Sequence, residues 1–161
     1  MELRLTKFSE ADFAAYLQLV QDEAVMAMIT ERALSLEEAQ ADYEKLLLNN
    51  SLQPDLGSFK VSNAVDNSFI GLAKLEVEEA ASQEAELGYI VCPAYWGQGV
   101  GSKIAALLIE LAHSQAQLLR LHAVIDPANI ASRKILVKNN FTHLEYQDFD
   151  GLPGEILGLT L

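Results

Sequence analysis

Three glycines at alternate positions, Gly97, Gly99 and Gly101, constrain the fold most, because an extended apolar segment precedes them and a long helix follows. The extended segment, Glu84–Val91, must end before Pro93, which has no backbone N–H to give to a sheet. Glycine allows positive φ and close backbone approach, and the first turn of a helix offers unpaired N–H groups. The sequence therefore predicts a strand–turn–helix unit whose turn binds a phosphate or pyrophosphate.

The same turn would also serve a protein that needs only tight packing of a strand against a helix. It is not a P-loop, because no Gly-Lys-Ser/Thr sequence ends it, and it lacks the wider glycine spacing of a dinucleotide-binding fingerprint. The helix after it is predicted over Gly99–Ala116, because apolar residues recur on one face. These residues are Ile104, Leu107, Leu108, Leu111 and Ala112.

Hydrophobic periodicity along the whole chain predicts one domain over residues 1–161, of mixed α/β or α+β class with a single sheet. The predicted strands are Leu3–Phe8, Phe59–Ser62, Phe69–Glu78, Glu84–Val91, Leu121–Ile125, Phe141–Phe149 and Glu155–Leu161, with a turn over Gly151–Gly154 before the last. The predicted helices are Ser9–Val20, Asp22–Ile29, Ser35–Leu48, Gly99–Ala116 and Ala128–Lys138.

The charge balance limits the classes of partner. The chain has 11 basic and 23 acidic residues, a formal net charge of −12. Such a polyanion repels nucleic acid unless its basic residues cluster, so we expect no nucleic-acid partner. A cationic or amine-bearing partner would be attracted at long range.

Cysteine and histidine usage argues against a metal site. The single cysteine, Cys92, excludes an internal disulfide and a multi-thiolate site, and the three histidines show no metal-ligand spacing. No stretch approaches the roughly 18 consecutive apolar residues of a membrane span. The N-terminus lacks the apolar core of a signal peptide. We therefore expect a cytoplasmic protein with no metal and no membrane partner.

The glycine turn resembles that of a known family. Gly97-Gln98-Gly99-Val100-Gly101 is similar to the acyl-CoA pyrophosphate loop of the GNAT superfamily of acetyl-CoA-dependent N-acetyltransferases, Gln/Arg-x-x-Gly-x-Gly/Ala, with Trp96 at the first marked position. Pro93-x-Tyr95-Trp96-Gly97-x-Gly99 resembles the branch that includes the ribosomal-protein N-terminal acetyltransferases.

A later segment extends the resemblance to about Glu84–Phe141. Asn129-x-x-Ser132, then Leu136 and Asn140-Phe141, is similar to that branch's Asn-x-x-Ser…Leu…Gly-Phe ending. Asn140 stands in place of the usual Gly, and Asn is the other residue that tolerates the left-handed conformation of a helix C-cap. Leu136 stands where many relatives carry a tyrosine general acid, so that role does not transfer.

The resemblance implies a twisted, mostly antiparallel mixed sheet of about seven strands with helices on both faces. It also implies acetyl-CoA as co-substrate, entering where the strands Glu84–Val91 and Leu121–Ile125 diverge. Backbone groups of the strand end would pair with the pantetheine arm, amides of the turn would hold the pyrophosphate, and an asparagine would cap its helix and contact the cofactor. The residues so implied are Ile90, Val91 and Cys92, then Gln98, Gly99, Val100, Gly101 and Ser102, then Asn129.

Two residues are candidates for catalysis. Glu86 lies on the strand that leads to the turn, and Glu84 shares its face, so a like charge could raise its pKa and make it a base or an acceptor-binding carboxylate. The alternative interpretation is that Glu86 belongs to an acidic strand face exposed to solvent. Ser132 could donate a proton to the leaving thiolate, and its alternative is an exposed helical serine. Cys92 is expected to pack at the strand end rather than act as a nucleophile.

The function implied is direct transfer of an acetyl group from acetyl-CoA to an amine in a ternary complex. The acceptor would be a protein N-terminal α-amine, slightly preferred through the branch resemblance, or a small cationic amine. The alternatives are a non-catalytic acyl-CoA-binding sensor or interaction module and, third, a phosphate-binding domain for another nucleotide. The apolar ending, Ile156–Leu161, suits either a core strand or the interface of a homodimer.

Overall fold

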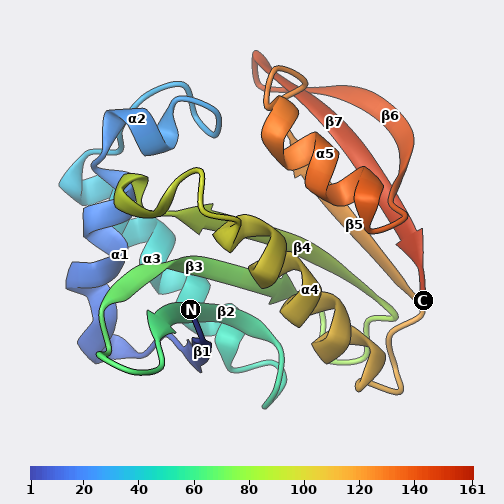
Figure 1. The fold of residues 1–161 in the computed structure, drawn as a ribbon, viewed down its shortest axis with the longest axis horizontal. Helices are drawn as coiled ribbons and strands as arrows, with labels where there is room; N and C mark the ends of the chain where they lie inside the picture. The colour runs from blue at the N-terminus through green and yellow to red at the C-terminus, as the bar shows by residue number, and fades with distance from the viewer.

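The computed structural model describes residues 1–161 and contains one seven-stranded sheet with helices on both faces (Figure 1). This confirms the predicted fold class. The strands are β1 Leu3–Lys7, β2 Gly57–Asn63, β3 Phe69–Glu76, β4 Glu84–Val91, β5 Arg120–Ile125, β6 Thr142–Phe149 and β7 Leu152–Thr160. The α-helices are α1 Phe13–Val20, α2 Glu23–Met26, α3 Leu36–Asn50, α4 Val100–His113 and α5 Ile130–Lys138, with 3₁₀ turns η1 Glu10–Asp12 and η2 Pro93–Tyr95.

The sheet has the order β1-β2-β3-β4-β5-β7-β6, and every neighbouring pair is antiparallel except β4 and β5. The parallel pair has only three residues in register, Glu84–Glu86 against Arg120–His122. Beyond them β4 continues to Val91 beside β3 while β5 follows β7. Figure 1 shows the two strands diverging from their paired end. The family resemblance implied this divergence, and it leaves one edge of β4 without a strand partner.

Two buried clusters hold the layers together. On one face, α4 packs Ile104, Leu108 and Ala112, all fully buried, against the centre of the sheet. On the other face, α1, α2 and α3 form a cluster around Phe8, Tyr16 and other apolar side chains. A fully buried leucine contributes about 2 kcal/mol through removal of its surface from water, so these clusters fix where the helices lie.

A buried carboxylate ties α5 to the last two strands. Glu155 of β7 is 1% exposed and accepts hydrogen bonds from Arg133 of α5, at 3.0 and 3.2 Å. His143 of β6 lies 2.7 Å from the same carboxylate. Burial alone would raise the pKa of Glu155, but the hydrogen bonds from Arg133 and His143 outweigh it and lower the pKa. A buried charge with this many partners fixes α5 relative to β6 and β7.

The predicted element boundaries hold within a few residues, with one informative exception. The turn predicted over Gly151–Gly154 lies at Asp150-Gly151, where both residues have positive φ, and β7 begins at Leu152. Pro153 lies near the start of this strand, where one missing N–H is tolerated. The segment Ile156–Leu161 lies mostly in β7, between β5 and β6, and is a core strand with Leu157 fully buried. Asn140 adopts the left-handed conformation expected of it, with φ of 70°.

None of the helices combines the length and the apolar character needed to cross a membrane.

The packing of α4 predicts the cost of a cavity. Leu108→Ala should lower the free energy of unfolding by about 2–5 kcal/mol, because Leu108 is fully buried between α4 and the sheet. Urea unfolding followed by circular dichroism measures this, with Leu119→Ala, at a side chain 45% exposed, as the control. A loss below about 1 kcal/mol at Leu108 would contradict the packing described here.

Candidate active site

The glycine turn is open to solvent and its backbone donors are free. Gly97 and Gly99 have φ of 74° and 77°, and a Cβ added to either would meet nothing within 4 Å. Gly99 is the N-cap of α4. No backbone N–H from Gln98 through Ser102 donates to a protein acceptor. A run of free amides at a helix start, with no side chain in front of it, is the geometry that binds a phosphate group.

The edge of β4 supplies a second set of free backbone groups, though fewer than the sequence implied. The N–H of Cys92 donates to the carbonyl of Ile70 on the β3 side, at 2.8 Å. Because residues alternate along an antiparallel ladder, Ile90 also directs its backbone groups toward β3, and Val91 directs its own toward the open edge. The assignment of the Cys92 amide, and with it the Ile90 amide, to the pantetheine arm is therefore wrong, and Val91 remains.

The carbonyl of Val91 already accepts a hydrogen bond from the indole N–H of Trp96, at 2.7 Å. Trp96 thereby fixes the course of the chain between the strand and the glycine turn. The N–H of Val91 is the group left for a ligand. The thiol of Cys92 is buried, and burial raises its pKa, which suits a packed strand-end residue better than a nucleophile.

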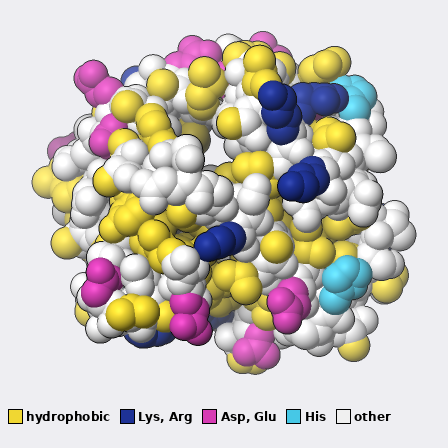
Figure 2. Space-filling model, viewed as in Figure 1, with side chains coloured by type: hydrophobic (Ala, Val, Ile, Leu, Met, Phe, Trp, Pro, Cys, Tyr) yellow, Lys and Arg dark blue, Asp and Glu magenta, His cyan; other side chains and the backbone are white.

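A cleft of about 740 Å³ lies where β4 and β5 separate. Its walls come from α1 and α3, from the segment after α2, from β3, β4 and β5, from α5 and from the β6–β7 turn. It brings together four of the residues singled out from the sequence, Glu86, Ile90, Asn129 and Ser132. Figure 2 shows the face of the molecule viewed in Figure 1, with apolar side chains exposed across it and basic side chains nearer its centre than acidic ones. The helices α4 and α5 contribute Lys103, Arg133, Lys134 and Lys138.

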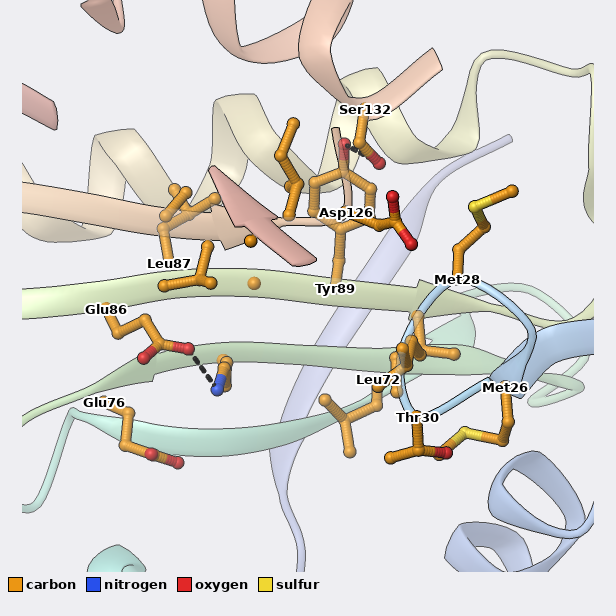
Figure 3. Close-up of a pocket in the computed structure, with 18 of the residues that line it drawn as sticks. Met26, Met28, Thr30, Leu72, Glu76, Glu86, Leu87, Tyr89, Asp126 and Ser132 are labelled. Carbon is orange, nitrogen blue, oxygen red and sulfur yellow. Dashed lines mark hydrogen bonds and ion pairs between the residues drawn. The ribbon is translucent and has the colours of Figure 1, made fainter. Parts of the chain in front are cut away.

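Glu86 has a different environment from the one predicted. Its carboxylate lies 2.5 Å from the ammonium of Lys74, an ion pair drawn as a dashed line in Figure 3. It also lies 3.6 Å from Nε2 of His122. Burial alone would raise the pKa of Glu86, but the contact with His122 and the charge of Lys74 lower it to about 2. The expectation that Glu84 raises this pKa is wrong, because His122 also lies between the two carboxylates, 3.1 Å from Glu84. Glu86 is an anion at neutral pH and a weak base.

Gly88 makes this ion pair possible. Lys74 lies opposite Gly88 in the β3–β4 register, and a Cβ on Gly88 would come 2.8 Å from Cε of Lys74. Because that space is empty, the lysine side chain lies flat across β4 and reaches Glu86. The floor of the cleft on this face therefore holds an ion pair, which leaves less negative charge for an acceptor than the acidic sequence suggests.

Asn129 and Ser132 lie on the other side of the strand separation, at the start of α5. The side-chain oxygen of Asn129 accepts a hydrogen bond from the N–H of Ser132, at 3.1 Å, so Asn129 is the N-cap that the sequence predicted. The hydroxyl of Tyr89 donates to the hydroxyl of Ser132, at 3.3 Å. Leu136 is 1% exposed and carries no group that could donate or accept a proton.

Among the charged residues of the cleft that sequence reasoning missed, Lys74 and Asp126 lie nearest the residues that it singled out. Lys74 lies on β3, and only the pairing of β3 with β4 shows that it reaches Glu86. Asp126 follows β5 directly, and Figure 3 shows its carboxylate beside Tyr89, facing the cleft. One oxygen of Asp126 accepts from the N–H of Ala128, at 2.8 Å. Its place after a strand and before a helix start was the available signal.

The cleft as a whole is acidic. Four carboxylates, of Asp42, Glu76, Glu86 and Asp126, line it against two lysines, Lys45 and Lys74. Opposite charge attracts a ligand into a cleft more strongly than across an open surface, because low-dielectric walls focus the field. The arrangement therefore fits a cationic ligand.

Comparison with known proteins identifies the family. A family model described as the Acetyltransferase (GNAT) domain matches residues 2–142, and the chain belongs to this family. It is similar to the probable N-acetyltransferase YjcK of Bacillus subtilis (strain 168), 30% identical over 84 residues, which are 52% of this chain and 46% of YjcK. The match thus spans about half the length of that relative. The uncharacterized N-acetyltransferase YnaD of the same strain is 24% identical over 136 residues, 84% of this chain and 76% of YnaD.

Solved structures share the fold over nearly the whole chain. An acetyltransferase of the GNAT family from Bacillus anthracis has a TM-score of 0.80 at 19% identity, over 99% of this chain and 95% of the other. The spermidine N-acetyltransferase from Vibrio cholerae, solved in complex with CoA and spermine, has a TM-score of 0.80 at 17% identity, over 98% and 95%. At such identities the likeness concerns the fold.

The ion pairs of Glu86 predict a pH-dependent contribution to stability. The contact with the Glu86 carboxylate, which can only accept a hydrogen bond, raises the pKa of His122. The contribution of this contact to stability is therefore complete below about pH 6.5 and is lost as pH rises through the raised value. The lowered pKa of Glu86 gives a contribution that is present above about pH 4.5. Glu86→Gln should therefore cost more stability at about pH 5.5 than at about pH 8.5.

Urea unfolding of both proteins at the two pH values measures the difference. Glu78→Gln, at an exposed position without an ion pair, is the control and should show no such pH dependence. An equal cost of Glu86→Gln at both pH values would show that His122 does not interact with Glu86 as described.

Proposed function

We propose that the chain is an N-acetyltransferase that transfers an acetyl group from acetyl-CoA to a cationic amine, directly and within a ternary complex. The observation that carries this proposal is the glycine turn, whose free amides lie at the start of α4 and directly after the unpaired edge of β4. An adjoining acidic cleft gives the acceptor a place to bind.

The chain's own residues fit the co-substrate. The amides of Gln98 through Ser102 would hold the pyrophosphate, and the edge of β4 at Val91 would pair with the pantetheine arm as a short added strand does. Asn129, at the opposite wall, would contact the cofactor as well as cap α5. The Vibrio cholerae enzyme that shares this fold was solved with CoA, which supports the proposal.

Transfer needs a polarised thioester carbonyl and a proton for the departing thiolate. The free N–H of Val91 would donate to the thioester oxygen, where negative charge develops in the transition state. Ser132, whose hydroxyl hydrogen has no protein acceptor, would supply the proton to sulfur. Glu86 would bind the acceptor as a carboxylate, because a pKa of about 2 leaves it a poor base.

This environment favours an acceptor that needs little help to lose its proton. A lysine-like amine with a pKa near 10.4 is neutral in about one molecule in 2,500 at pH 7, whereas an α-amine near 7.8 is neutral in about one in seven. We therefore propose a protein N-terminal α-amine with a positive charge nearby as the acceptor, ahead of a small polyamine. The spermine bound by the Vibrio cholerae enzyme and the acidic cleft both support a cationic acceptor.

The cellular setting and the assembly state belong to the same proposal. A single buried cysteine suits a reducing compartment, and we propose the cytoplasm. The strand β6 is the edge of the sheet and is exposed along nearly its whole length, with Leu144 and Tyr146 open to solvent. This edge supports a homodimer formed there rather than through β7, which is internal.

The rival function is an acyl-CoA-binding sensor without turnover, and Leu136 is the feature that favours it. A thiol-release assay with acetyl-CoA and a panel of amines, including peptides with a free N-terminus, separates the two. Release of CoA with any acceptor supports the enzyme. Tight binding of CoA with no release across the panel supports the sensor.

The glycine turn gives the most direct test of cofactor binding. Gly99→Val should weaken CoA binding at least about tenfold, because a β-branched residue at φ of 77° costs about 1–2 kcal/mol and would move the amides. Isothermal titration calorimetry measures the affinity. Gly151→Val is the matched control, since Gly151 has φ of 90° and equally open surroundings but lies in the β6–β7 turn. Equal affinity of the Gly99 variant and this control would refute the loop assignment.

Glu86→Gln tests the acceptor side of the site. The variant should lower kcat/KM for a cationic acceptor about tenfold, because one hydrogen-bonded charge is lost, while CoA affinity stays the same. Steady-state kinetics combined with calorimetry separate the two effects. Glu84→Gln, two residues earlier on the same face and paired with Arg120, is the control. Unchanged kinetics in Glu86→Gln would remove Glu86 from the acceptor site.

A further inference from the structure

Five hydroxyl side chains line the cleft, and one pair of them differs from the rest. Ser58 is nearly fully buried, Tyr16 belongs to the cluster of α1 and α3, and the hydroxyl of Thr30 donates to the carbonyl of Arg32. The remaining two, Tyr89 and Ser132, are hydrogen-bonded to each other. A hydrogen bond between a strand and a helix ordinarily has a structural role. Whether this pair can also act in catalysis depends on where it lies in the cleft.

The Tyr89–Ser132 pair bridges the two walls of the strand separation. Tyr89 comes from β4 and Ser132 from α5, and the first turn of α4 lies against the tyrosine ring. A Cβ on Gly101 would come 3.3 Å from Cε2 of Tyr89 and 3.2 Å from Cδ1 of Ile135, so the ring is held between α4 and α5. A chain that runs from the glycine turn along the edge of β4 must pass this pair. Figure 3 shows Tyr89 and Ser132 on one side of β4 and Glu86 on the other.

The direction of the hydrogen bond leaves one hydrogen available. Tyr89 donates to Oγ of Ser132 at 3.3 Å, so the hydrogen of Ser132 itself is not used in this contact. Ser132 donates to no backbone carbonyl of α5 either. A serine hydroxyl that accepts one hydrogen bond becomes a better donor through its own hydrogen.

We propose that Tyr89 and Ser132 form a two-hydroxyl relay that protonates the departing thiolate, with Tyr89 as the residue that resupplies Ser132. This inference rests on the proposed acetyl transfer. In the step, the acceptor nitrogen bonds to the thioester carbon, the C–S bond breaks and its electron pair stays on sulfur. Ser132 gives its hydrogen to sulfur and takes the hydrogen of Tyr89. The proton that leaves the acceptor nitrogen passes to water, and the tyrosinate regains a proton from water.

The surroundings of Tyr89 keep its phenol protonated before each turnover. Burial raises the pKa of Tyr89, although the hydrogen bond to Ser132 opposes this, so the phenol is protonated at neutral pH. The carboxylate of Asp126, which follows β5, lies beside the tyrosine ring (Figure 3). From α4 and α5, Gly101 and Ser132 approach the tyrosine, and neither is charged.

Thiol ionisation in the CoA complex tests the relay without requiring turnover. Hydrogen bonds from the relay should stabilise bound CoA thiolate, so Tyr89→Phe and Ser132→Ala should each raise the pKa of the bound thiol by about one pH unit, a tenfold change. Ultraviolet absorbance of the thiolate, followed against pH in the saturated complex, measures this. Tyr146→Phe, which removes an exposed hydroxyl without a hydrogen bond, is the matched control.

Steady-state kinetics, with an amine that the wild-type protein acetylates, give the second measurement. Tyr89→Phe should lower kcat about 10- to 100-fold, at the low end for general acid catalysis because a thiolate is already a good leaving group. The double variant Tyr89→Phe/Ser132→Ala should be no slower than the slower single variant, because both residues serve one proton. Phenylalanine keeps the ring against Gly101, so the fold is retained.

The outcomes separate the relay from the proposed function. A raised thiol pKa in both variants supports the relay, even if no acceptor in a panel is turned over and acetyl transfer itself fails. The same thiol pKa in wild type and both variants overturns the relay, even if acetyl transfer is confirmed. Additive losses of kcat in the double variant overturn the shared proton path. Failure of the wild type to bind CoA overturns both proposals.

Discussion

The short parallel pairing between β4 and β5 is the constraint on which the rest of the site depends. Three residues in register join one half of the sheet to the other, and beyond Glu86 no strand pairs with β4 on the side that faces β5. An unpaired strand edge inside a domain is costly unless something satisfies its backbone groups. Here the indole of Trp96 satisfies one of them, and the N–H of Val91 remains for a ligand. The cleft, the free edge and the bridge by Tyr89 and Ser132 all follow from this separation.

The cleft has an acidic lining, but basic side chains contact the neighbouring carboxylates of Glu84 and Glu86. Lys74 from β3 and His122 from β5 both reach Glu86, and His122 also reaches Glu84. These contacts keep Glu86 ionised and reduce its basicity, so that its attraction for a cation survives while its capacity to remove a proton does not. The proposed acetyl transfer would therefore rely on the acceptor's own pKa and on hydroxyl groups across the cleft.

Local signals in the sequence were sufficient for the fold and for the turn. Pro93 ended β4, alternate glycines left the turn open, and Asn129 capped α5, because each of these effects acts within a few residues. The pKa of Glu86 could not be predicted from its neighbours on the same strand. Its partners come from strands 12 and 36 residues away, and only the sheet register brings them together. The pairing with β3 also decides which backbone groups of Ile90, Val91 and Cys92 face outward. These groups alternate in direction along the strand, so the three residues cannot all pair with the pantetheine arm.

The empty space at Gly88 has a consequence for how this cleft could diverge among related chains. Lys74 reaches Glu86 only by lying across that position, so any side chain there would lift the lysine away and strip the carboxylate of its strongest counter-ion. A single replacement far from the glycine turn would thus change the charge presented to the acceptor without disturbing the grip on the diphosphate. In the proposed enzyme, the charge that meets the acceptor and the amides that meet the diphosphate thus belong to separate parts of the chain.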